Sequence, residues 1–151
     1  NPDAAHAFAT DGEMDTRLDE IYAISEPGLH CRGGLPADEL PRGLGFYRLQ
    51  YPQSATAPAM PDFRAALDGN PTPALVVKGR CDYLSWRSAM TYVETLPNTQ
   101  LVYLRGGGHN AYQDEPERYL AAVRSFLLGE PSAIAPRTKV DPPDDYEGPT
   151  G

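Results

Sequence analysis

The stretch TPALVVKG (72–79) is an almost continuous apolar run that lies between a proline and a glycine. Such a run is expected for a buried strand of a parallel sheet. A second run of this kind, TQLVYLRG, spans residues 99–106. Between the two runs, apolar residues recur at the three- and four-residue spacings of an amphipathic helix: Trp86, Ala89, Met90, Val93 and Leu96. The centre of the sequence therefore predicts a strand, a helix and a second strand.

Further helices are predicted on both sides of this unit. Residues 61–69 predict a short helix, and residues 114–129 predict a longer one. In the longer helix, we expect Asp114 to be the N-cap and Glu117 to complete a capping box. Four residues mark its expected apolar face: Leu120, Val123, Phe126 and Leu127. Strands that alternate with helices predict an α/β fold with a parallel sheet and right-handed crossovers.

Two strands are too few for a complete sheet of this kind, because an isolated pair leaves apolar edges and faces open. The chain is therefore expected to be part of something larger. Outside the unit, residues 15–25 predict a helix that Asp15 caps, followed by turns rich in proline and glycine. From Glu130 the composition shifts to proline, aspartate and glycine, which predicts an extended or disordered tail over 130–151.

The composition excludes some partners. The formal net charge is −8 and the pI is near 4.7, which argues against a nucleic acid because phosphate binding needs a basic surface. No apolar run approaches the ~20 residues of a membrane span. Asn1 in place of methionine predicts a processed product, one chain of a cleaved precursor or an artificially trimmed chain.

Two cysteines are present, Cys31 and Cys81. Neither belongs to a CxxC motif or to a cluster with the spacing of a zinc site, so we expect two buried free thiols. His30 precedes Cys31 but has no metal-ligand partners at a fitting spacing. The sequence leaves the compartment open and favours the cytoplasm only slightly.

Two chemically active side chains follow the two predicted strands. Asp82 comes after the first strand and His109 after the second, and ligands of an open α/β sheet meet the carboxyl ends of its strands. A carboxylate in this position can accept a hydrogen bond from imidazole Nδ1, which leaves Nε2 to take a proton. The glycines at 106–108 allow the tight turn that this requires.

Simpler roles remain open for each of these residues. Asp82 can be a helix N-cap, and His109 can be an ordinary loop histidine. Tyr83 and Trp86 follow the acid and can either wall a substrate pocket or pack in the core.

The segments PALVVKGRCD (73–82) and LVYLRGGGHNAYQDEPERYLAAVRSFL (101–127) resemble the last two strands, the histidine loop and the last helix of an α/β-hydrolase fold. Asp114 and Pro116 also match the family pattern downstream of the histidine. The proline-iminopeptidase-like branch is the most similar. The resemblance implies a triad in the order Ser, Asp, His, with Asp82 and His109 as its catalytic acid and histidine. It implies no metal and no organic cofactor.

No G-x-S-x-G motif occurs in the 151 residues. The resemblance therefore implies that the nucleophile, the oxyanion hole and most of the sheet lie on a second polypeptide. Residues 1–60 would be the rear part of a cap and a linker, and 61–129 the C-terminal segment of the hydrolase core.

On this interpretation the chain is the C-terminal half of a two-chain serine hydrolase or acyltransferase. Its substrate would be a small molecule or peptide with an ester, amide or thioester bond. One alternative is a non-catalytic α/β-hydrolase-like subunit that binds a ligand. A second is a small flavodoxin-like binding domain in which the Asp–His pair is accidental.

Overall fold

The computed structural model describes residues 9–33 and 64–151. The chain forms two compact units, the first made of 1–27 and 35–62 and the second of 28–34 and 63–151. Most of the cap predicted for residues 1–60 thus lies outside the described residues. Within the described ranges, no helix is both long and apolar enough to cross a membrane.

The described part of the first unit is dominated by helix α2, Asp11–Ser25. Its N-cap is Thr10, whose side chain accepts from the backbone N–H of Glu13 while the Glu13 carboxylate binds back to Thr10. The sequence-based start at Asp15 was wrong, because this capping box begins the helix four residues earlier. A short 3₁₀ turn, η1 (Glu26–Leu29), follows.

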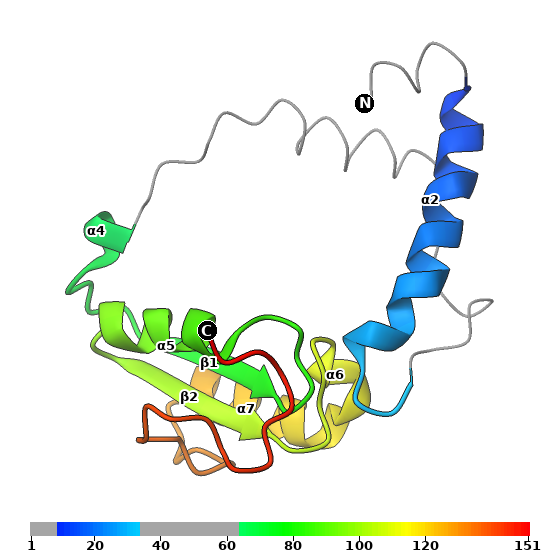
Figure 1. Ribbon diagram of the computed structural model, residues 1–151. Coiled ribbons are helices and arrows are strands. Elements are labelled where there is room, and N and C mark those ends of the chain that lie inside the picture. Colours follow the sequence, from blue (N-terminus) through cyan, green and yellow to red (C-terminus); the bar gives the residue numbers. More distant parts are fainter. Residues whose placement is uncertain (1–8, 34–63) are drawn as a thin grey trace. The chain divides into compact units, whose positions relative to one another are not determined.

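The second unit contains a parallel pair of strands. Strand β1 (Ala74–Gly79) pairs with β2 (Thr99–Leu104), so that Ala74 lies opposite Thr99 and Gly79 opposite Leu104. Helix α5, Trp86–Thr95, connects them. Figure 1 shows both arrows pointing the same way, toward the loops that lead into α5 and α6. The predicted strand, helix and strand are confirmed, and the short helix predicted before them is α4, Arg64–Leu67.

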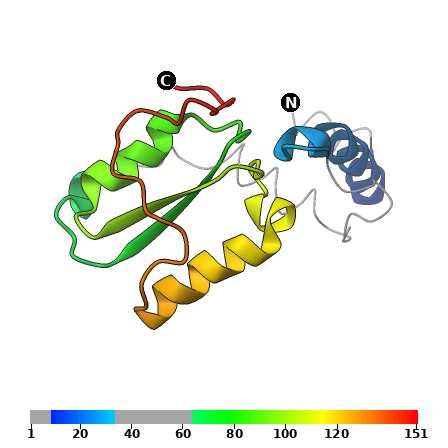
Figure 2. The same cartoon turned by 90° about the horizontal axis from the view of Figure 1, so that it is seen from below.

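Helices lie on both faces of this small sheet, with α5 on one face and α7 (Pro116–Leu128) on the other (Figures 1 and 2). Side chains of β2 alternate between the faces. The core on the α5 side consists of Trp86, Ala89, Met90, Leu101 and Tyr103. Val102 and Leu104, the alternate residues of β2, are fully buried.

The final helical region differs from its prediction in two ways. A separate turn, α6 (Ala111–Asp114), precedes α7, and the N-cap residue Glu115 makes no side-chain capping bond. The capping box expected from Asp114 and Glu117 is therefore wrong, because the Asp114 carboxylate is used elsewhere. Two residues of the predicted apolar face, Leu120 and Leu127, are 63% and 74% exposed.

Strand β1 is also incompletely covered. Its first four residues, 74–77, are only partly buried, whereas Leu101–Leu104 of β2 are buried. A parallel strand made of apolar residues is normally covered on both sides. Among the described residues, apolar side chains of β1 thus stay only partly buried, and Leu120 and Leu127 of α7 are exposed.

Residues 130–151 form no helix or strand and run extended over the side of β2 and α5 (Figure 2). The backbone N–H of Arg137 donates to the carbonyl of Leu101 in β2 at 2.7 Å. The indole N–H of Trp86 donates to the carbonyl of Val140 at 2.6 Å. The tail thus covers the outer edge of β2, which would otherwise be open to pairing with another strand.

Candidate active site

The two predicted residues meet at the carboxyl ends of the two strands. His109 Nδ1 lies 3.0 Å from Asp82 Oδ1. Asp82 stands in the turn after β1, and His109 in the loop after β2, so adjacent parallel strands deliver the two side chains to one edge of the sheet. With the proton on Nδ1, imidazole donates to the carboxylate and Nε2 is left as the basic nitrogen.

The Asp82 carboxylate is held from three sides. Oδ1 also accepts from the backbone N–H of Leu84 at 3.0 Å, and Oδ2 accepts from Lys78 Nζ at 2.8 Å. Burial by itself would raise the pKa of Asp82, but the hydrogen bonds from Lys78, Leu84 and His109, with the charge of Lys78, together lower it. Asp82 is thus a fixed anion beside the imidazole near neutral pH.

Close approach of the two loops depends on glycine. The carbonyl oxygens of Gly107 and Gly108 occupy the space that a Cβ on Gly79 would need. The backbone N–H of Cys81 donates to the carbonyl of Gly107 at 3.1 Å, which joins the turn of Asp82 to the loop of His109. The predicted need for glycine is met by close packing of backbones rather than by positive φ angles at 106–108.

The imidazole is open to solvent on its other side. The His109 side chain is 34% exposed, against 9% for Asp82. Within the described ranges, Nε2 of His109 makes no hydrogen bond. The Tyr83 ring lies 4.5 Å from the imidazole, centroid to centroid, and Tyr83 is itself half exposed. Tyr83 is therefore an exposed aromatic neighbour of the imidazole ring.

Trp86 does not reach this opening. It is 2% exposed and packs edge-on against Tyr103 and Tyr146. Of the two roles that the sequence left open for Trp86, the structure places it in the core.

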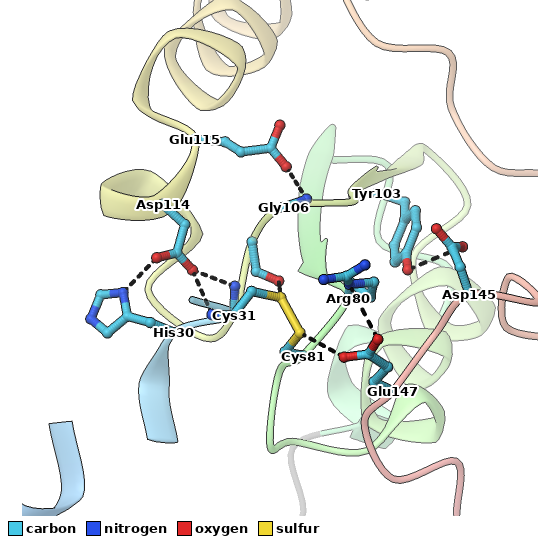
Figure 3. Close-up of a disulfide and its surroundings, with 12 residues drawn as sticks. His30, Cys31, Arg80, Cys81, Tyr103, Gly106, Asp114, Glu115, Asp145 and Glu147 are labelled. Atoms are coloured by element: carbon cyan, nitrogen blue, oxygen red, sulfur yellow. Dashed lines mark hydrogen bonds and ion pairs between the residues drawn. A yellow bond between two sulfur atoms is a disulfide. The ribbon is translucent and has the colours of Figure 1, made fainter. Parts of the chain in front are cut away.

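Cys31 and Cys81 form a disulfide, with their Cα atoms 5.2 Å apart (Figure 3). The prediction of two free thiols was wrong, because motif spacing reveals local cysteine pairs but not a pair that the fold brings together. The bond joins the segment after η1 to the residue next to Asp82. Cys31 Sγ also lies 3.1 Å from the carbonyl oxygen of Gly107, in the histidine loop. Disulfides are typical of oxidising compartments.

A second histidine–carboxylate pair lies beside the disulfide. His30 Nδ1 is 2.6 Å from Asp114 Oδ1, and Asp114 Oδ2 accepts from the backbone N–H of Gly108 at 2.6 Å and of Cys31 at 3.3 Å (Figure 3). This is the use of Asp114 that replaces the predicted capping box. The carboxylate connects the segment after η1 directly to the residue before His109.

Sequence reasoning did not assign a supporting role at the site to three residues: His30, Asp114 and Lys78. His30 and Asp114 are 84 positions apart, so no local pattern shows their pairing. Lys78 left a visible signal, since it is a lysine inside an apolar strand four residues before Asp82. Within 9–33 and 64–151, no group of three or more His, Cys, Asp or Glu side chains could hold a metal ion.

None of the five serines in the described ranges is hydrogen-bonded to His109. The hydroxyls of Ser25, Ser88, Ser125 and Ser132 donate to backbone carbonyls, and Ser85 caps α5. Ser54 lies outside the described residues. The site therefore has an acid and a histidine, while the described residues provide no serine in reach of the histidine.

Several curated proteins are similar to part of this chain. Human "Putative protein-lysine deacylase ABHD14B" is 34% identical over 58 residues, which are 38% of this chain and 27% of that protein. "Protein ABHD14A" of mouse is 36% identical over 37% of this chain and 23% of its own length. "Putative carbamate hydrolase RutD" of Pseudomonas syringae pv. syringae is 35% identical over 46% of this chain and 27% of its own length.

The matched part of the chain spans about a quarter of these relatives, which are all α/β-hydrolases. No protein-family model matches the chain, and no solved structure matches it significantly. The parallel strand pair with helices on both faces agrees with these partial matches. Over this segment, the chain is similar to α/β-hydrolases.

Proposed function

We propose that this chain supplies the acid and the histidine of a Ser–Asp–His triad in a serine hydrolase or acyltransferase. The observation that supports this proposal best is the 3.0 Å contact between His109 Nδ1 and Asp82 Oδ1, on an imidazole that is partly exposed to solvent. The nucleophilic serine and the oxyanion hole come from polypeptide outside these 151 residues. We take this to be a second chain that carries the N-terminal part of the fold.

In this mechanism, Nε2 of His109 removes the proton from the serine hydroxyl as Oγ attacks the substrate carbonyl carbon. Asp82 keeps the other ring proton on Nδ1 and stabilises the imidazolium that forms. When the tetrahedral intermediate collapses, His109 gives its proton to the leaving group. Water or another acceptor then attacks the acyl-enzyme, and His109 takes and returns a proton a second time.

The incomplete surfaces of the second unit support a partner. The outer side of β1 is only partly buried, and Leu120 and Leu127 of α7 are exposed. A further strand beside β1 would cover the strand, and the widened sheet would reach the α7 leucines. This is where the strands that precede β1 in an α/β-hydrolase sheet would add.

The relatives support a carbonyl substrate. Their names describe a protein-lysine deacylase and a carbamate hydrolase, and both reactions attack a carbonyl carbon. We therefore propose an ester, amide or thioester substrate for this site, with Tyr83 beside the approach to His109. The proline-iminopeptidase-like branch stays a prediction.

Native mass spectrometry and an active-site probe test the proposal together. The purified native protein should contain a polypeptide with G-x-S-x-G, either as a separate chain or joined to this one. A fluorophosphonate probe should label that serine and no residue of this chain. The variant His109→Ala should lose nearly all labelling, because the serine is no longer activated.

Three results would count against the proposal. A lone 151-residue monomer in the native preparation would remove the serine from the mechanism. Label on a serine of this chain would place the nucleophile elsewhere. Equal labelling of wild type and His109→Ala would remove His109 from the reaction, and would favour the ligand-binding subunit.

A further inference from the structure

Strand β1 carries a buried cation. Lys78 is 2% exposed, although it stands in a run of apolar residues. Burying an ammonium group is costly unless it is paired and hydrogen-bonded. The burial of a lysine at position 78 therefore needs an explanation other than its place in the strand.

Among the described residues, the Lys78 ammonium contacts the Asp82 carboxylate, the carbonyl of Leu84 and the ring of Tyr146. Nζ donates to Asp82 Oδ2 at 2.8 Å and to the carbonyl of Leu84 at 2.5 Å. The ring of Tyr146, from the C-terminal tail, covers it with its centroid 5.8 Å from Nζ. The Tyr146 hydroxyl donates to the same Leu84 carbonyl at 3.1 Å. Lys78 is thus fixed by the turn that carries Asp82 and closed off by the tail.

We propose that Lys78 is a positioning residue that acts on His109 through Asp82. It holds Oδ2 of the carboxylate so that Oδ1 faces the imidazole, and its charge offsets part of the attraction between Asp82 and the protonated His109. The ring then takes up a proton less readily than it would beside an unpaired carboxylate. The inference rests on the proposed role of His109 as the general base.

The other titratable groups near the pair do not supply such a charge. The Tyr83 ring faces His109. Burial, and then the negative charge of Asp82, raise the pKa of Tyr146 to about 12, so its hydroxyl is neutral near pH 7. Asp82 contacts no charged side chain among the described residues other than Lys78 and, when protonated, His109. Removing the charge of Lys78 therefore leaves the Asp82 carboxylate unopposed.

The test is a titration of His109 in the complete protein, including the part that carries the serine. The sequence has three histidines, at positions 6, 30 and 109, so His109→Ala assigns the relevant imidazole signal by NMR. In Lys78→Met, we expect the titration midpoint of His109 to move up by about one pH unit. The acidic limb of the kcat/KM profile should move with it.

Matched variants separate charge from structure. Lys139→Met makes the same charge change at the only other lysine, which is exposed in the tail, and should leave the midpoint unchanged. Lys78→Arg keeps the charge and should keep the wild-type midpoint. In an Asp82→Asn background, Lys78→Met should produce little further shift, because the charge acts through the carboxylate.

An unchanged or lowered midpoint in a folded Lys78→Met protein would overturn the proposal. If that variant does not fold, Lys78→Gln decides the matter, since it keeps a hydrogen-bond donor and lacks the charge. The NMR midpoint does not depend on turnover. If a fluorophosphonate probe does not label the wild type, the proposed function is wrong. The shift of the His109 titration midpoint in Lys78→Met still tests the role of Lys78.

Discussion

The second unit contains two pairs of histidine and aspartate with the same atoms in contact. In both, Nδ1 of the ring faces Oδ1 of the carboxylate, at 2.6 Å in His30–Asp114 and 3.0 Å in His109–Asp82. The side chain of His30 is 3% exposed, whereas that of His109 is 34% exposed. Burial thus distinguishes a pair that joins segments from one whose ring can meet a substrate.

The partners of the two carboxylates show the same division of roles. Asp114 accepts from two backbone N–H groups, of Gly108 and Cys31, and so connects loops. Asp82 accepts a hydrogen bond from the Lys78 ammonium, whose positive charge offsets part of the negative charge of the carboxylate. We infer that the buried pair holds the loop on which the open pair acts.

Replacing each histidine in turn tests whether the two pairs have different roles. We expect His109→Gln to lower kcat by about 10⁶-fold, as loss of a triad histidine does. In His30→Gln, kcat should stay within about tenfold of wild type, since its ring does not face the opening. Steady-state kinetics and a thermal melt of both variants check this. A larger loss of kcat in His30→Gln than in His109→Gln would reverse the assignment.

Asp82→Asn tests the acid of the open pair. We expect kcat to fall by about 10⁴-fold with the fold intact, because the amide favours the wrong imidazole tautomer. Circular dichroism would show the fold, and the kinetics the loss. Wild-type kcat in this variant would mean that Asp82 is only structural.

The disulfide supports the buried pair, and its removal should affect stability more than chemistry. It joins residues 50 apart, and closing such a loop contributes about 4 kcal/mol in the chain-entropy model. The double variant Cys31→Ser/Cys81→Ser should lose stability of this order in urea unfolding. Dithiothreitol should lower the stability of the wild type by a similar amount and leave the double variant unaffected. No response of the wild type would show that the bond is not formed.

Asp114→Asn weakens the buried pair while keeping its shape. The loss of a charged acceptor for His30 and Gly108 should cost about 2 kcal/mol of folding stability. It should also lower kcat modestly, through the histidine loop. Glu130→Gln, an exposed acidic residue beyond α7, is the matched control and should change neither. If both variants behave alike, Asp114 does not hold the loop.

Lowering the pH should reduce the contribution of the His109–Asp82 pair to folding stability, which is a smaller effect. The pKa of Asp82 in the folded state is lowered from 3.8, so the unfolded chain binds its proton first as the pH falls. The contribution of Asp82 to stability is then complete above about pH 4 and is lost as the pH falls through the folded value. The difference in unfolding free energy between wild type and Asp82→Asn should shrink as the pH falls below 4. A constant difference down to pH 2 would contradict this.

The sequence predicted those features that depend on local pattern. The apolar runs predicted β1 and β2, and the three- and four-residue spacing predicted α5, in which Ala89 and Met90 are buried as expected. The meeting of Asp82 and His109 followed from the geometry of parallel strands alone. These signals all lie within a few residues of the element that they predict.

The features that sequence reasoning missed depend on contacts between distant segments. The Cys31–Cys81 bond and the His30–Asp114 pair join residues 50 and 84 positions apart. The apolar stripe through Leu120 and Leu127 was identified, but these two residues are exposed among the described residues. Local patterns show that a face is apolar and do not show what covers it.

The disulfide also has a consequence for processing. Cys31 and Cys81 stand on either side of residues 34–63. A protease that cuts the backbone once anywhere between the two cysteines would produce two fragments that remain covalently attached. A non-reducing gel would then show one band, and a reducing gel two. Cleavage in this interval would therefore leave the segment that holds His30 covalently attached to the turn that carries Asp82.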